Sequence, residues 1–192
     1  VGDWNRFNRN TGGTLVEKCC HFFDLMNVIV RQRPLRVYAS GAADVNHRDE
    51  RYGGERPDIL DNAFAVVDFE GGARALLDLC MFAENSTNEM EIAATGDRGK
   101  VEAFVPAHRL VVTRRDRNEA ATITFPVDAN LAQAGAHHGS TFFEHIAFRD
   151  AIRSGGKPVV SVSDGALAVA MGLAGERSAR LGRPVDLAEL GF

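Results

Sequence analysis

The sequence predicts an α+β fold: an open, largely antiparallel or mixed β-sheet with helices packed on one of its faces. Helical periodicity occurs near the start and in the last third, while the middle consists of short apolar runs joined by turns. Strands gathered into one block between helices are typical of α+β domains rather than of alternating α/β folds. With 192 residues and 45% hydrophobic content, we expect a single domain over residues 1–192.

The first predicted element is a helix from Leu15 to about Val30. Residues 1–12 are polar and aromatic and predict a loop, and Thr11 to Thr14 supply a glycine turn with a possible N-cap. Pro34 ends the helical segment. Apolar residues recur at helical spacing: Leu15, Cys19, Phe22, Phe23, Met26 and Val30.

The middle of the chain predicts consecutive β-hairpins. Short turns that contain glycine or charged residues join the apolar runs, a pattern typical of antiparallel pairing. A polar loop over residues 46–58 separates the first strand from the second. The predicted strands cover residues 35–42, 61–69, 73–82, 89–96, 100–104, 108–115 and 120–127.

The strands at 61–69 and 73–82 carry apolar residues on both faces. Successive side chains of a strand point to opposite faces, so such strands need cover on both sides. The predicted helices can cover one face only. We therefore expect a homo-oligomer, a dimer or tetramer, in which a partner subunit packs on the open sheet face.

Two further helices close the sequence. Each has polar residues at its start, glycine at its end and proline shortly beyond. The predicted boundaries are Ser140/Thr141 and Gly155–Gly156 for the first helix, and Ser163 or Asp164 and Gly182 for the second.

Composition narrows the function classes. The net charge is −4, and no basic stripe accompanies it, so we expect no nucleic-acid partner. No apolar run is long enough to span a bilayer, so we expect no membrane partner. The three cysteines are few and odd in number, which favours a reduced, cytoplasmic protein. The chain begins with Val1, which suggests a piece of a longer protein.

The segment GGTLVEKCCHFFDLM combines Glu17, His21 and Asp24. Spacings of four and three residues place these groups close together on a helix. A carboxylate beside an imidazole suits proton transfer near neutral pH. The simpler interpretation is a helix with one satisfied histidine and two surface carboxylates, and spacing alone favours it.

Other chemistries have weaker support. HExxH and CxxC are absent, and His137–His138 is a weak metal signal, so we expect no metal site. Cys19 or Cys20 beside His21 is a conceivable nucleophile, although buried helical cysteines are usually inert. No GxGxxG or GxxxxGK[ST] motif is present.

Several polar residues near the first helix have two open interpretations. Trp4, Asn5 and Arg6 suit the mouth of a polyol-binding pocket, or they anchor the loop. Lys18 points about 100° away from Glu17 on a continuous helix, so it is either a site residue or an ordinary exposed lysine.

The order of these motifs resembles the Gfo/Idh/MocA oxidoreductase family. The segment TGGTLVEKCCHFFDLM resembles the family's GG-x-L-x-D-x-x-x-H-x-x-D pattern. DNAFAVVDFEGGARALLDLCMF resembles its paired strands, EMEIAATGDRGKVEAF its GT-x-G strand pair, and the sequence after residue 141 its closing helices. The resemblance covers nearly the whole chain.

This resemblance implies the C-terminal domain of a longer enzyme. Family members bind NAD or NADP with an N-terminal Rossmann domain, which also carries the catalytic lysine, and use the C-terminal domain for substrate binding and oligomerisation. It implies a dehydrogenase acting on a sugar, inositol or related polyol, inactive as the isolated chain. A non-catalytic binding or scaffold domain and an NAD-dependent glycosidase are the alternatives on the same fold.

The resemblance also implies roles for individual residues. His21 matches the histidine that exchanges a proton with the substrate hydroxyl, and Asp24 matches the second acid of the helix. Glu17 stands where aspartate is usual, and its extra methylene is expected to shift the polyol contact. The expected catalytic residues are His21 and Glu17, and the expected substrate-binding residues are Trp4, Arg6, Lys18, Asp24 and His138.

Overall fold

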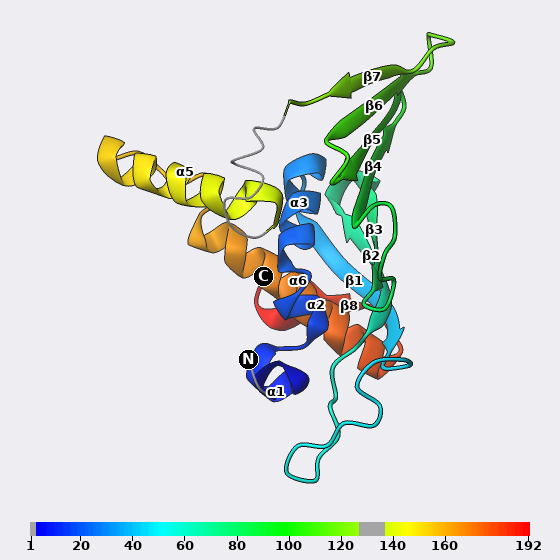
Figure 1. Cartoon of the computed structure of the whole chain (residues 1–192), viewed down its shortest axis with the longest axis vertical. Coiled ribbons are helices and arrows are strands. Elements are labelled where there is room, and N and C mark those ends of the chain that lie inside the picture. The colour runs from blue at the N-terminus through cyan, green and yellow to red at the C-terminus, as the bar shows by residue number, and fades with distance from the viewer. Residues whose placement is uncertain (1–2, 127–136) are drawn as a thin grey trace. The chain divides into compact units, whose positions relative to one another are not determined.

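A computed structural model describes residues 3–126 and 137–192. The chain forms two compact units, each of which contains one antiparallel sheet (Figure 1). The first unit comprises Val1–Glu84 and Val160–Phe192, and the second comprises Asn85–Val159. The predicted α+β class is confirmed, with the strands distributed over two four-stranded sheets.

The first unit contains a sheet in the order β3-β2-β1-β8. Every neighbouring pair is antiparallel, and the tight turn η2 (Glu70–Gly72) joins β2 to β3. Gly71 has a φ of 77°, a conformation that favours glycine in such a turn. The strands are β1 (Pro34–Ala42), β2 (Asn62–Phe69), β3 (Arg74–Cys80) and β8 (Val185–Asp186).

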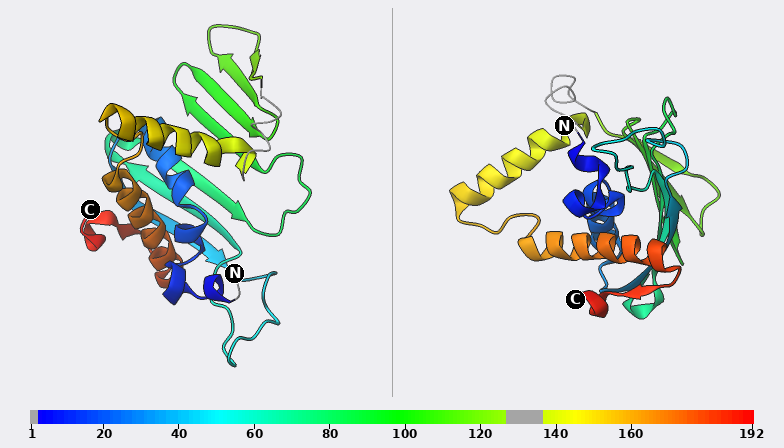
Figure 2. Two further views of the ribbon diagram at one scale, coloured as in Figure 1. Left: turned by 60° about the vertical axis from the view of Figure 1, so that its left-hand side comes forward. Right: turned by 90° about the horizontal axis from the view of Figure 1, so that it is seen from below.

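One face of this sheet and three helices form the core. The helices are α2 (Thr14–Glu17), α3 (Cys20–Val30) and α6 (Val162–Leu181). Figure 2 shows α3 and α6 on the same face of the sheet, and side chains from both helices join the buried cluster. The buried cluster includes Leu15, Cys19, Phe23, Val37, Ala39, Ala63, Ala65, Val67, Phe69, Leu77, Met171 and Ala174.

The opposite face of the sheet is apolar and exposed, as the two-sided strand pattern predicted. Tyr38, Phe64 and Leu76 are 44%, 57% and 61% exposed. Tyr38 lies opposite Val66, and Val66 lies opposite Leu76, so the apolar side chains form a row across three strands. This row, together with Phe64, is the outer apolar face.

The predicted helix from Leu15 to Val30 is wrong at its centre, because a turn at Lys18–Cys19 separates α2 from α3. Glu17 and His21 therefore lie on two different helices. The turn leaves Leu15, Cys19 and Phe23 all buried, so the apolar spacing continues across the break. Three short helices complete the unit: η1 (Trp4–Arg6), α1 (Asn8–Thr11) and η4 (Leu187–Leu190).

The last long helix begins earlier than predicted. Its N-cap is Ser161 rather than Ser163 or Asp164, and its end at Gly182 is as expected. The Ser161 hydroxyl accepts the Asp164 N–H, while the Asp164 carboxylate accepts the Ser161 N–H. This capping box satisfies two backbone donors at once and therefore fixes the start of the helix.

The second unit contains a sheet in the order β4-β5-β6-β7, again antiparallel throughout. The predicted N-cap at Ser140/Thr141 is wrong, because Gly139 caps the helix with a φ of 88° and the Ser140 hydroxyl donates to the His137 carbonyl. The elements are β4 (Met90–Gly96), β5 (Gly99–Val105), β6 (Arg109–Arg114), β7 (Ala121–Thr124), η3 (His137–Gly139) and α5 (Ser140–Ser154).

The last predicted strand ended at residue 127, which lies outside the described residues. Across residues 3–126 and 137–192, no helix is both long and apolar enough to cross a membrane. The same residues contain no group of three or more histidine, cysteine, aspartate or glutamate side chains that could hold a metal ion.

Candidate functional site

The paired glycines before α2 allow this helix to pack against α6. Gly12 and Gly13 have φ values of 81° and 103°, which residues with a Cβ rarely adopt. A Cβ on Gly13 would also lie 2.3 Å from Cδ of Glu176. The Glu176 carboxylate accepts the Leu15 N–H at 2.8 Å, so α6 supplies an acceptor to the N-terminus of α2. Burial raises the pKa of Glu176 despite this hydrogen bond.

A polar pocket lies beside α2, and the loop between β1 and β2 contributes to its wall. Three predicted site residues line it: Arg6, Glu17 and Lys18. The Lys18 ammonium lies 3.0 Å from the Glu17 carboxylate, so these two charges compensate each other. The remaining lining residues are Asn5, Thr11, Gly13, Thr14, Asn46, His47, Ile59, Leu60, Asp61 and Met81.

The loop between β1 and β2, residues 43–61, is the pocket loop. The Asp61 side chain fixes the start of this loop to the sheet. The residue is 2% exposed, and its carboxylate accepts the backbone N–H groups of Asp44, Val45 and Asn46 at 3.0, 2.7 and 2.6 Å. Burial acts to raise the pKa of Asp61, but these N–H groups and the Asn62 amide outweigh it and lower the pKa below its usual range. The carboxylate is therefore ionised at neutral pH.

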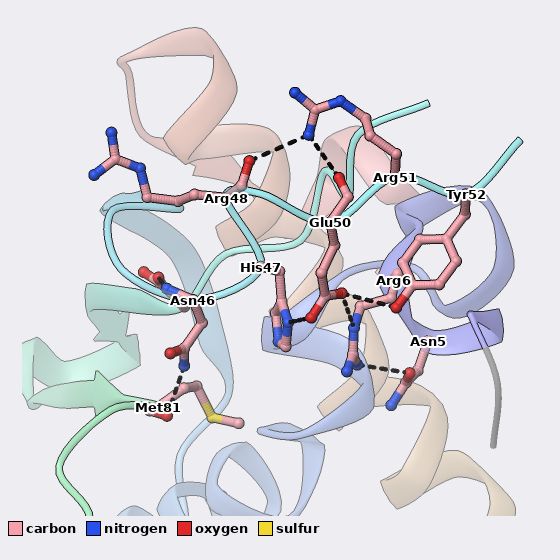
Figure 3. A network of polar contacts seen from close by, with 10 residues as sticks. Asn5, Arg6, Asn46, His47, Arg48, Glu50, Arg51, Tyr52 and Met81 are labelled. Atoms are coloured by element: carbon pink, nitrogen blue, oxygen red, sulfur yellow. Dashed lines mark hydrogen bonds and ion pairs between the residues drawn. The ribbon is translucent and has the colours of Figure 1, made fainter. Parts of the chain in front are cut away.

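Glu50 is the centre of a second network in the same loop (Figure 3). One carboxylate oxygen lies 2.7 Å from Nδ1 of His47, and the other accepts hydrogen bonds from Nε of Arg6 at 3.1 Å and from the Tyr52 hydroxyl at 2.8 Å. His47 first, then Tyr52 and Arg6, lower the pKa of Glu50 to about 2. Arg6 also donates to the Asn5 side chain at 2.9 Å. The network ties η1 to the pocket loop.

Sequence reasoning missed His47 and Glu50. The segment was predicted only as a polar loop, although NHRDERY holds a dense set of charged and aromatic residues. The pairing of Arg6 with Glu50 spans 44 positions, and no local periodicity reports contacts of that range. The density of ionisable residues was the only available signal.

The other predicted site residues lie outside the lining of this pocket as the described residues define it. His21 is exposed on α3, with its ring centroid 4.0 Å from that of Phe22. Asp24 is half-buried on the same helix, and Trp4 is exposed in η1. His138 belongs to the second unit, where its Nε2 lies 2.9 Å from the Glu89 carboxylate.

Cys19 is unsuited to nucleophilic chemistry. The side chain is fully buried, and burial, followed by the charges of Cys20, Glu176 and Glu17, raises its pKa to about 12. The thiol therefore stays protonated at neutral pH, when only the thiolate is an effective nucleophile.

The chain is an α+β domain with a polar pocket in its first unit. Residues 2–187 match the family described as "Oxidoreductase family, C-terminal alpha/beta domain", the Gfo/Idh/MocA family. The chain belongs to this family, as the sequence resemblance predicted.

Individual relatives agree with this assignment. The chain is 25% identical over 183 residues to a myo-inositol 2-dehydrogenase of Thermotoga maritima, covering 95% of the chain and 51% of that protein. It is structurally similar to a levoglucosan dehydrogenase solved with NADH and levoglucosan (TM-score 0.77, 21% identity, 95% of this chain and 53% of the other). An oxidoreductase domain protein from Kribbella flavida gives a TM-score of 0.77 at 19% identity, over 96% of this chain and 54% of the other. The chain thus spans about half the length of these relatives.

Proposed function

We propose that this chain is the substrate-binding and proton-transfer domain of an NAD(P)-dependent dehydrogenase that acts on a sugar, inositol or related polyol. The observation that carries the proposal is a charge-compensated polar pocket lined by Glu17, with His21 exposed at the start of the next helix, in a chain of this family. The named relatives, which act on myo-inositol and levoglucosan, support the substrate class.

In this proposal His21 takes the proton from the reacting hydroxyl group, or returns it in the reverse direction. An exposed imidazole suits this role because it is accessible to a substrate held between this chain and a second domain. Glu17 holds the substrate hydroxyls, and Lys18 keeps its carboxylate in place through the 3.0 Å ion pair.

The residues present fit the substrate end of a nicotinamide site. They supply an exposed imidazole and a paired carboxylate, while the sequence lacks the glycine-rich motif that holds a pyrophosphate. Nicotinamide, when bound, supplies the hydride acceptor. We assign its binding mainly to an N-terminal Rossmann domain of the full-length protein and expect the protein to be cytoplasmic.

The test is a dehydrogenase assay on the full-length protein with NAD or NADP and a panel of polyols that includes myo-inositol. His21→Gln should lower kcat by roughly 10²- to 10⁴-fold, the usual contribution of a general base. The matched control is His145→Gln, since His145 is also exposed and was not assigned to the site. The 192-residue chain alone should show no turnover.

Two results would overturn the proposal. An unchanged rate in the His21 variant would indicate a non-catalytic binding or scaffold domain. Cleavage of aryl glycosides that requires NAD, without net formation of NADH, would indicate a glycosidase. We also propose that a second copy of the chain packs on the outer apolar face, because exposed apolar patches of this kind mark protein interfaces.

A further inference from the structure

We propose that His47 binds a hydroxyl group of the substrate through Nε2, and that Glu50 is the residue that positions its ring. This inference rests on the proposed polyol substrate. It adds a residue of the pocket loop that binds the substrate, whereas His21 transfers the proton. His47 lines the pocket, and its other ring nitrogen is engaged by Glu50 at 2.7 Å.

Glu50 fixes the orientation of the His47 ring, because both oxygens of its carboxylate are engaged in hydrogen bonds. The carboxylate binds Nδ1 of His47 with one oxygen and Arg6 and Tyr52 with the other, so it cannot rotate without losing three contacts (Figure 3). A ring held in one orientation is prepared for binding, because little side-chain entropy remains to be lost.

The backbone of His47 supports a functional role. Its φ is 61°, in the left-handed region that costs energy for a residue with a Cβ. The preceding residue, Asn46, is held by its N–H bond to Asp61 and by its side-chain amide, which donates to the Met81 carbonyl at 2.8 Å. The loop is therefore anchored next to the strained position, and this anchoring holds His47 at the pocket wall.

The charge of Glu50 determines which nitrogen of the His47 ring carries the hydrogen, and therefore which group Nε2 presents to the pocket. An ionised carboxylate can only accept hydrogen bonds, so Nδ1 of His47 must carry the hydrogen. When the ring is neutral, Nε2 then carries a lone pair and can accept a hydrogen bond from a hydroxyl group. Polyols offer many such donors.

The compensated charges around the pocket favour a neutral substrate. Arg6 is paired with Glu50, Lys18 with Glu17, and Asp61 with backbone N–H groups. A sugar acid or a sugar phosphate would need a cation without a partner carboxylate at the wall. We therefore infer a preference for neutral polyols over their carboxylate and phosphate derivatives.

The experiment compares steady-state kinetics of the full-length protein and its variants. His47→Asn is the first variant, because asparagine tolerates a positive φ and keeps the loop conformation. Loss of one neutral hydrogen bond should raise KM for the polyol by roughly 3- to 10-fold with kcat little changed. The control is Asp49→Asn, an exposed residue of the same loop, which should behave as the wild type.

Glu50→Gln tests the positioning role by a second readout. Nitrogen-15 NMR of the His47 ring should show the Nδ1–H tautomer in the wild type and a loss of that preference in the variant, since an amide can also donate to Nδ1. A KM increase of roughly 2- to 5-fold should accompany it. A purely structural role for Glu50 would leave the tautomer unchanged.

The outcomes separate this inference from the proposed function. Wild-type activity on polyols together with an unaffected His47→Asn variant would overturn the inference alone, as would a lower KM for sugar acids than for the parent polyols. If the wild type turns over no polyol, the proposed function fails, and titration of the 192-residue chain with myo-inositol decides the inference. A shift of the His47 Nε2 resonance supports it, and no shift overturns it.

Discussion

Gly172→Ala should destabilise the protein even though glycine is a poor helix former. Gly172 lies in α6 where this helix meets α2. An added Cβ would lie 2.6 Å from the Leu15 carbonyl oxygen and 3.0 Å from both the Leu15 carbonyl carbon and Cα of Val16. All three are backbone atoms, so no side-chain rotation can relieve the clash, and α2 must move away from α6.

Two opposing contributions determine how much Gly172→Ala changes the free energy of unfolding. Replacing glycine by alanine inside a helix gains about 1 kcal/mol from helix propensity. Forcing an extra methyl group into a packed contact costs about 1–3 kcal/mol, and here the neighbours are rigid, which places the cost at the upper end. The free energy of unfolding should therefore fall by about 1–2 kcal/mol.

Gly165→Ala is the matched control. Gly165 lies in the same helix, but apart from its own stretch of that helix no heavy atom lies within 4 Å of the position where its Cβ would be. Only the propensity gain remains, so this variant should be more stable than the wild type by about 0.5–1 kcal/mol. Urea unfolding followed by circular dichroism measures both values. Equal stability of the two alanine variants would refute the close α2–α6 packing.

Two other features have measurable consequences. Asp61→Asn should lower the free energy of unfolding at pH 7 by about 1–3 kcal/mol, because it replaces a buried acceptor of three backbone N–H groups. The folded pKa of Asp61 lies below that of an unfolded chain, so its contribution is complete above about pH 4 and is lost as the pH falls through the folded pKa. Urea unfolding at pH 7 and pH 3 should show a smaller acid-induced loss in the variant, and an equal loss would contradict this account. Leu76→Lys should weaken self-association in sedimentation while leaving the unfolding free energy within about 0.5 kcal/mol, and an unchanged oligomer would exclude the outer apolar face as the interface.

Much of the fold could be predicted because local patterns report it. Short apolar runs joined by turns identified the strands from β1 to β7, and the two-sided apolar pattern of β2 and β3 identified the exposed face. The break between α2 and α3 could not be predicted. No glycine or proline marks Lys18–Cys19, and Leu15, Cys19 and Phe23 keep their helical spacing across it. Beside the break, α2 packs against α6, a tertiary contact that local spacing does not report.

The candidate site also contains some residues that could be predicted from the sequence and others that could not. Arg6, Glu17 and Lys18 were predicted and do line one pocket. His47 and Glu50 were not predicted, because a loop has no periodicity and their partners lie far away in the sequence. Helices and strands have a periodic pattern of apolar residues that can be recognised in a sequence. A loop has no such pattern, and its conformation depends on the residues that bind its ends and its centre.

The pocket wall has two parts, each with its own anchor, and one hydrogen bond joins them. On one side, Glu176 and the close contact at Gly172 fix α2, which carries Glu17. On the other side, Asp61 fixes the loop that carries His47. The Thr14 hydroxyl of α2 donates to the Leu60 carbonyl at 2.6 Å. This contact lies at the end of the loop, away from His47 in the sequence, so substitutions at His47 should change substrate recognition without disturbing α2. His47 variants should therefore act on KM and His21 variants on kcat, and the double variant should show the product of the two single effects, as expected for residues that are not coupled. A double variant far from that product would show that the loop and the helices respond to substrate as one body.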